Sequence, residues 1–145
     1  MVQGLGDMGL SLTFAAIGSA LGTGAAGMAA VGAWKKAFIQ NKAAPFILIA
    51  FVGAPLSQTI YGMILKGRIA AANMDPATYP YQIVMGLAAG LAMGFSAWMQ
   101  GKAGASAADA LAETGQGFGN YIMVLGVIET VALFVMVFMM IALPK

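Results

Sequence analysis

Neither cysteine nor histidine occurs among the 145 residues of this sequence. Disulfide bonds are therefore excluded, and so are the usual transition-metal sites, which take their ligands from these residue types. Charged residues are also scarce: they make up 8% of the chain, whereas soluble domains carry about 25%. The hydrophobic share is 61% and the mean hydropathy is +0.87. This composition predicts an integral, multi-pass membrane protein without a separate soluble domain.

Long uncharged stretches predict where the chain crosses the membrane. Three stretches carry no charge at all (8–34, 43–65 and 76–101), and a fourth (114–144) is interrupted only by Glu129. Each exceeds the roughly 20 residues that a spanning helix needs. We therefore expect an all-α membrane protein, a single domain over 1–145, with transmembrane helices at about 8–34, 44–65, 80–105 and 118–143. These pair into two fused helical hairpins, at about 8–65 and 80–143.

Lysine and arginine in the loops indicate the orientation, because cytoplasmic loops carry more of them. The first and third connections hold four such residues, and the opposite side holds three. This bias favours termini on the outside. The residues are Lys35, Lys36, Lys42 and Lys102 on one side, and Lys66, Arg68 and Lys145 on the other.

An internal repeat relates the two hairpins. The segment "GSALGTGAAG" (18–27) aligns with "FSAWMQGKAG" (95–104) at an offset of 77 residues, which pairs Ser19 with Ser96. The first hairpin has no acidic residue between Met8 and Met74, so it lacks an equivalent of Glu129. The chain is therefore predicted to consist of two hairpins of parallel topology that share one carboxylate.

The first and third predicted helices are rich in Gly, Ala and Ser, whereas the fourth is rich in Phe, Met, Val and Leu. Small residues let helix backbones approach closely in lipid. We expect the small-residue helices to pack together, the bulky ones to face outward, and copies of the chain to assemble into a ring. The stretch "GTGAAG" (22–27) also matches the G-x-G-x-x-G nucleotide pattern. That pattern requires a preceding strand, so we expect no nucleotide on this chain.

Polar residues within the apolar helices point to a binding site. Pro55 lies inside the second predicted helix, lacks an N–H and frees backbone carbonyl groups. The third helix is predicted to end near Gln100, and the fourth contains Glu129. One face of the second helix, at spacings of three and four residues, carries Ala54, Ser57, Gln58 and Tyr61.

Glu129 is the least expected of these residues, because an ionisable group at this depth costs about 2.5 kcal/mol or more. A protonated glutamic acid that joins helices is one interpretation. Taken singly, the other polar residues also have structural interpretations: Ser57 as a bond to its own helix, Tyr61 as an interfacial anchor and Gln100 as a helix cap. Taken together they supply only oxygen ligands and one negative charge, which suits a hard monovalent cation. A proton would leave several polar groups unused, so the chemistry favours Na⁺.

Four segments carry a family resemblance: "AIGSALGTGAAG", "APLSQTIYG", "FSAWMQGKAG" and "VIETV", one from each predicted helix. With these, the chain resembles the proteolipid (K or c) subunit of V-type and A-type rotary ATPases, in its sodium-translocating form. The resemblance implies a rotor ring of identical copies in lipid, a stator subunit that holds an arginine, and central-stalk subunits. It places ATP chemistry on partner subunits, so this chain is expected to be no enzyme by itself. A bacterial or archaeal cell membrane is the expected location.

The resemblance also implies the ligands of the ion. Glu129 corresponds to the ion carrier, Gln100, Gln58 and Ser57 to further side-chain ligands, and the carbonyl of Ala54 to a fifth. Tyr61 would donate to the Glu129 carboxylate, and Pro55 would distort the second helix. The sequence departs from the sodium-type pattern at Ser57, where threonine is usual.

Two other functions stay open from the sequence. The first is the same rotor carrying protons, which needs only Glu129 and one or two hydrogen-bond partners. The second is a small multidrug transporter with one membrane glutamate, which would need an aromatic cavity, whereas the neighbours of Glu129 in the sequence are aliphatic.

Overall fold

The computed structural model describes residues 6–72 and 74–144. Within these residues every regular element is helical. Four segments are long and apolar enough to cross a membrane: 10–39, 46–71, 76–114 and 118–141. This confirms the predicted all-α membrane protein. The elements are α1 (Leu10–Ile39), η1 (Phe46–Leu48), α2 (Ile49–Gly53), η2 (Ala54–Leu56), α3 (Ser57–Ala71), η3 (Pro76–Thr78), α4 (Tyr79–Thr114) and α5 (Phe118–Ile141).

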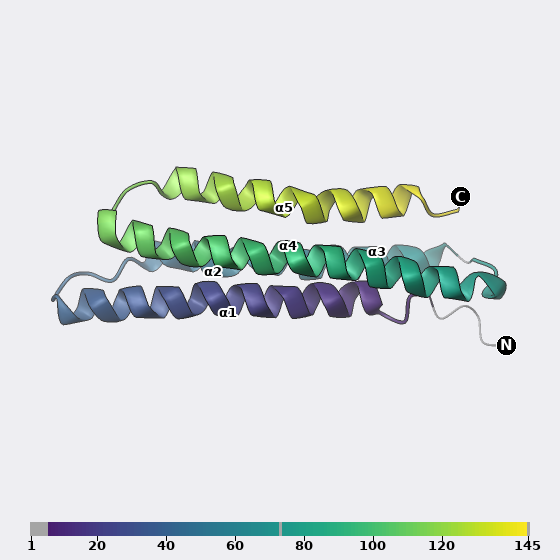
Figure 1. The fold of residues 1–145 in the computed structure, drawn as a ribbon, viewed down its shortest axis with the longest axis horizontal. Helices are drawn as coiled ribbons and strands as arrows, with labels where there is room; N and C mark the ends of the chain where they lie inside the picture. Colours follow the sequence, from purple (N-terminus) through teal and green to yellow (C-terminus); the bar gives the residue numbers. More distant parts are fainter. Residues whose placement is uncertain (1–5, 73, 145) are drawn as a thin grey trace.

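The helices lie side by side along one axis (Figure 1). In that view α1 and α4 are neighbours and run in the same direction, α5 lies beyond α4, and the helix containing α2 and α3 lies behind. The connections 40–45 and 115–117 are at one end. The connection between α3 and α4 is at the other end, together with the start of α1 and the end of α5. The arrangement is two fused hairpins of parallel topology, as the repeat predicts.

Glycines bring the backbones of α1 and α4 into contact. A Cβ atom at Gly18 would overlap the backbone of Gly94, and one at Gly101 would overlap the backbone of Gly22. Any larger residue at these positions would therefore force the two helices apart. The prediction that the small-residue helices pack together is confirmed. The bulky side chains of α5 mostly face outward, since only Leu125, Ala132 and Met136 are buried there.

The ends of two helices differ from the predicted ones. Helix α1 continues past Trp34 to Ile39, because Lys35 and Lys36 end the apolar stretch and not the helix. Helix α4 runs to Thr114, well beyond the predicted end at 105. Its last part is rich in alanine, the best helix former, and it stops where Gly115 takes a left-handed conformation (φ 67°).

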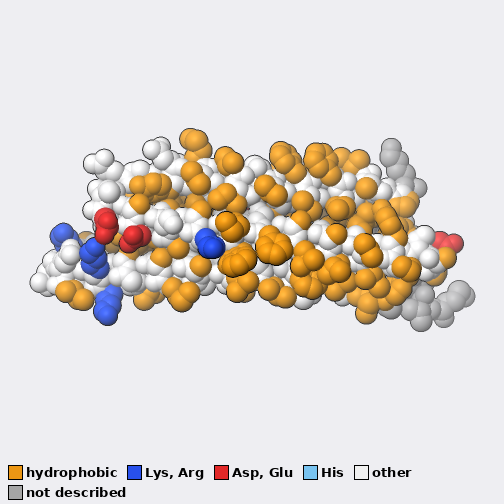
Figure 2. All heavy atoms as spheres, in the orientation of Figure 1, with side chains coloured by type: hydrophobic (Ala, Val, Ile, Leu, Met, Phe, Trp, Pro, Cys, Tyr) orange, Lys and Arg blue, Asp and Glu red, His pale blue; other side chains and the backbone are white. Residues whose placement is uncertain are grey.

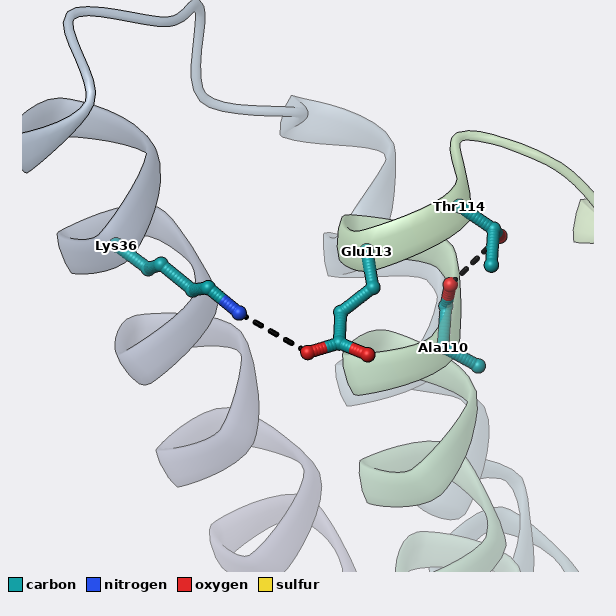
Figure 3. A network of polar contacts seen from close by, with 4 residues as sticks. All are labelled: Lys36, Ala110, Glu113 and Thr114. Carbon is teal, nitrogen blue, oxygen red and sulfur yellow. Dashed lines mark hydrogen bonds and ion pairs between the residues drawn. The ribbon is translucent and has the colours of Figure 1, made fainter.

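Apolar side chains cover most of the length of the face shown in Figure 2, and charged side chains gather mainly towards its ends. One ion pair joins α1 to α4 close to their ends: Lys36 Nζ lies 3.0 Å from Glu113 Oε1 (Figure 3). Both side chains are more than half exposed. Nearby, the Thr114 hydroxyl donates to the carbonyl of Ala110 at 2.7 Å, within the last turn of α4. This end of the bundle is therefore polar, as expected of a part that leaves the lipid.

Candidate ion-binding site

The candidate site lies beside a break in the second membrane-spanning helix. The helix changes to 3₁₀ geometry at Ala54–Leu56. Because Pro55 has no N–H, the carbonyl of Phe51, one turn earlier, loses its helical donor. That oxygen faces α4 instead: a Cβ atom at Gly104 would lie 2.9 Å from it. The Ala54 carbonyl accepts hydrogen bonds from the N–H of Ser57 and, at 3.2 Å, from its hydroxyl.

Side-chain hydrogen bonds lead from this break across the bundle. The single hydrogen of the Ser57 hydroxyl is shared between the Ala54 carbonyl and Gln58 Oε1, which lies 3.1 Å from Ser57 Oγ. Gln58 Nε2 donates to Gln100 Oε1 at 2.8 Å. Gln100 Nε2 then donates to Glu129 Oε2 at 3.1 Å and to the carbonyl of Leu125 at 3.0 Å. Both glutamines are fully buried. The chain of bonds therefore connects α3, α4 and α5 inside the molecule.

The Glu129 carboxylate receives a donor on each oxygen. Tyr61 Oη donates to Oε1 at 2.6 Å from α3, and Gln100 donates to Oε2 from α4. The Glu129 side chain itself is only partly buried. The carboxylate thus lies at the surface of this chain, with its polar partners on the inner side.

The structure brings the predicted site residues together. Tyr61 and Gln100 contact the carboxylate directly, Gln58 reaches it through Gln100, and Ser57 reaches it through Gln58. The expectation that α4 ends near Gln100 is wrong. Gln100 is buried well inside α4, because the alanine-rich segment after it stays helical to Thr114.

One family model matches part of the chain. Residues 83–142 match the family model of the C subunit of ATP synthase. This segment contains nearly all of α4 and α5, and with them Gln100 and Glu129. In this segment, which is less than half of the chain, the protein is similar to the proteolipid (c) subunits of rotary ATPases. A comparison with curated proteins gave no match.

Proteins of this family are non-catalytic rotor subunits of membrane ATPase complexes. Such subunits form a ring of identical copies beside a stator subunit, and the ring carries the coupling ion. The match covers the second hairpin. The first hairpin is related to the second by the internal repeat. It also contacts the second hairpin through the glycines of α1 and α4 and through the hydrogen bond between Gln58 and Gln100.

The structure also shows a buried acid, Asp7, that the sequence analysis did not single out. Asp7 is 1% exposed, and its two oxygens accept hydrogen bonds from the N–H groups of Gly9 and Ser11, both at 2.9 Å. The Ser11 hydroxyl donates to it as well. Asp7 therefore caps the start of α1 and lies apart from the candidate ion site. An aspartate just before an apolar helix is a known capping signal, which could have identified it.

Proposed function

We propose that this chain is a proteolipid, the Na⁺-carrying rotor subunit of a V-type ATPase or ATP synthase. The proposed ligands are the carboxylate of Glu129, the side-chain oxygens of Gln100, Gln58 and Ser57, and the carbonyl of Ala54. The observation that carries the proposal is the unbroken chain of hydrogen bonds that links these groups to a single carboxylate.

The donor set favours Na⁺ over divalent ions. All the proposed ligands are oxygen atoms, which hard cations prefer. One carboxylate balances one monovalent charge and leaves the loaded site neutral, whereas a divalent ion would leave a net charge in the lipid. Because Glu129 is only partly buried, this neutrality matters most when the loaded site faces the hydrocarbon.

Proton transport is the second candidate, and one observation favours it. Tyr61 and Gln100 already give the carboxylate two hydrogen-bond partners, which is all that a proton site requires. Gln58 and Ser57 weigh against it, because neither contacts the carboxylate and both place further polar groups inside an apolar bundle. A proton site gives these two residues no function.

The proposed cycle follows from charge. A ring copy exchanges its ion where a stator arginine faces Glu129, since only there is the ionised carboxylate neutralised without Na⁺. The loaded, neutral copy then moves through lipid. Central-stalk subunits would couple this rotation to ATP chemistry on other chains. Lys35, Lys36 and Lys42 cluster around the first connection, which favours termini outside. Lys102, counted with the third connection from the sequence, lies inside α4 and adds nothing to this bias. The resemblance implies a bacterial or archaeal cell membrane.

Modification of Glu129 by a hydrophobic carbodiimide tests the ion directly. The reagent attacks protonated carboxyl groups in apolar surroundings, so bound Na⁺ should slow the reaction. We expect protection in the millimolar range that weakens as pH falls, partial protection by Li⁺ and little by K⁺. The modified residue must be mapped by peptide mass, because Asp7 is also buried. Modification that depends on pH and ignores Na⁺ would assign the site to protons.

A further inference from the structure

Helix α1 carries two buried hydroxyl groups that nothing in the site explains. Among the described residues, neither Ser19 Oγ nor Thr23 Oγ1 has a hydrogen-bond partner. Ser19 is 2% exposed. Buried polar groups are nearly always bonded, and a serine within a helix usually bonds to a carbonyl of its own helix. The Ser19 hydroxyl is therefore buried inside the bundle and can still form a hydrogen bond with another polar group.

The contacts between α1 and the second spanning helix fix what lies opposite Ser19. These helices are antiparallel (Figure 1) and touch at two levels. A Cβ atom at Gly62 would lie 2.9 Å from the Cβ of Ala15, and one at Gly22 would lie 2.9 Å from the Cβ of Pro55. Seven residues separate the two levels on each helix, so the two helices stay in register between them.

Ser19 and Gln58 occupy the same level between these contacts. Ser19 follows Ala15 by four residues, and Gln58 precedes Gly62 by four. Residues four apart share one face of a helix, so each lies on the face that meets the other helix. Both residues are buried. The amide of Gln58 is thus the polar group of the second spanning helix that lies at the level of Ser19.

The internal repeat supports a partner for Ser19 on its neighbouring helix. Ser96 stands at the same repeat position in the second hairpin, and its hydroxyl donates to the carbonyl of Ile128 on α5 at 2.9 Å. The serine of the second hairpin is therefore bonded across to the outer helix of that hairpin. The equivalent partner of Ser19 would come from the helix that carries Gln58.

Ion binding would change the hydrogen-bond partner that the side-chain amide of Gln58 needs. In the structure Gln58 Nε2 donates to Gln100 Oε1. A cation bound by Gln100 Oε1 would repel that N–H group, so the amide of Gln58 must present its oxygen to the ion and direct its N–H₂ elsewhere. A buried N–H₂ needs an acceptor. We propose that Ser19 accepts this hydrogen bond in the ion-loaded site, and so is a positioning residue for Gln58; the inference rests on the proposed Na⁺ function.

The test compares the assembled full-length proteolipid with its Ser19→Ala variant. The readout is the Na⁺ concentration that half-protects Glu129 from the carbodiimide. Loss of one hydrogen bond should raise this concentration by roughly threefold to tenfold. The rate of modification without Na⁺ should stay unchanged, since the Ser19 hydroxyl is unbonded in the described arrangement. Ser106→Ala, which removes a hydroxyl bonded only to its own helix at Lys102, is the control and should not shift protection.

The same substitution in a Gln58→Ala background separates positioning from a general effect. If Ser19 acts through Gln58, Ser19→Ala should not raise the half-protecting Na⁺ concentration further in the Gln58→Ala background. A rise as large as in the wild-type background would overturn the inference. Equal protection of Ser19→Ala and wild type, with wild type protected by Na⁺, would also overturn it and leave the proposed function intact. A wild type that Na⁺ does not protect would overturn both. Should Ser19→Ala fail to assemble, Ser19→Cys, whose sulfur is a weak acceptor, should show the same weakened protection.

Discussion

The outer helices of the two hairpins differ in continuity and in charge, whereas the inner helices α1 and α4 are related by the repeat. The outer helix of the first hairpin is interrupted by 3₁₀ geometry at Ala54–Leu56, and it carries two hydroxyls, an amide and a phenol but no acid. Helix α5 is an unbroken helix of 24 residues whose only charged residue is Glu129.

This difference explains why one chain has one candidate site. Helix α5 supplies the carboxylate, and the two donors to it come from Tyr61 on α3 and Gln100 on α4. The interrupted helix supplies polar groups but no carboxylate. Neither hairpin holds the full set, so each is incomplete without the other.

Removing the charge of α5 should have the largest effect. In Glu129→Gln we expect ion-coupled transport to be lost completely, because no other acid lies among the spanning helices at this level. The ring should still form, since an amide costs less in lipid than a carboxylate. Transport of Na⁺ into vesicles by the reconstituted complex measures the loss, and gel migration of the ring is the control. Transport that persists would refute the role of Glu129.

Forcing the inner helices apart should have the next largest effect. In Gly22→Val the new side chain would meet the Ala97 carbonyl and Pro55, and overpacking costs about 1–3 kcal/mol or more. We expect little or no assembled ring on a native gel. The matched variant Gly32→Val has open space around it and should assemble normally. Equal assembly of both variants would contradict the close packing of α1 and α4.

Alanine variants of the two glutamines compare a direct with an indirect contact to the carboxylate. Gln100 contacts the carboxylate, while Gln58 reaches it through Gln100. A lost ligand that interacts with charge is worth about 1.5 kcal/mol or more, which is tenfold or more in affinity. We expect at least this loss in Na⁺ protection for both alanine variants, and the greater loss for Gln100→Ala. If neither variant changes the Na⁺ dependence, the proton function is favoured.

The ion pair at the end of the bundle should matter least. Lys36 and Glu113 are both more than half exposed, and surface pairs contribute little. We expect Lys36→Ala to leave the thermal stability of the assembled ring and its Na⁺ protection unchanged. A clear fall in the melting temperature would show that this pair holds α1 and α4 together at the polar end.

The sequence predicted the four spanning helices because uncharged length is a direct consequence of the bilayer thickness. Helix ends were less predictable. Lys35 and Lys102 mark where uncharged sequence stops, while α1 and α4 continue as helices beyond them. This is why Gln100 was expected at a helix end and lies instead in the buried interior.

The polar residues of the site could be chosen from the sequence by their cost in lipid and their helical spacing. Their pairing could not, because it depends on how α3, α4 and α5 are rotated against one another. Ser19 shows this limit most clearly. Its sequence neighbours are small residues typical of close packing, and only the register of α1 against Gly62 and Pro55 places it level with Gln58.

Equilibrium binding of radioactive Na⁺ to the purified ring measures whether the two hairpins of each chain share one ion site. At saturating Na⁺ and alkaline pH, where protons compete least, we expect one Na⁺ per chain, and none in Glu129→Gln. Two ions per chain, no specific binding, or binding that survives in Glu129→Gln would show that the two hairpins do not share a Na⁺ site at Glu129.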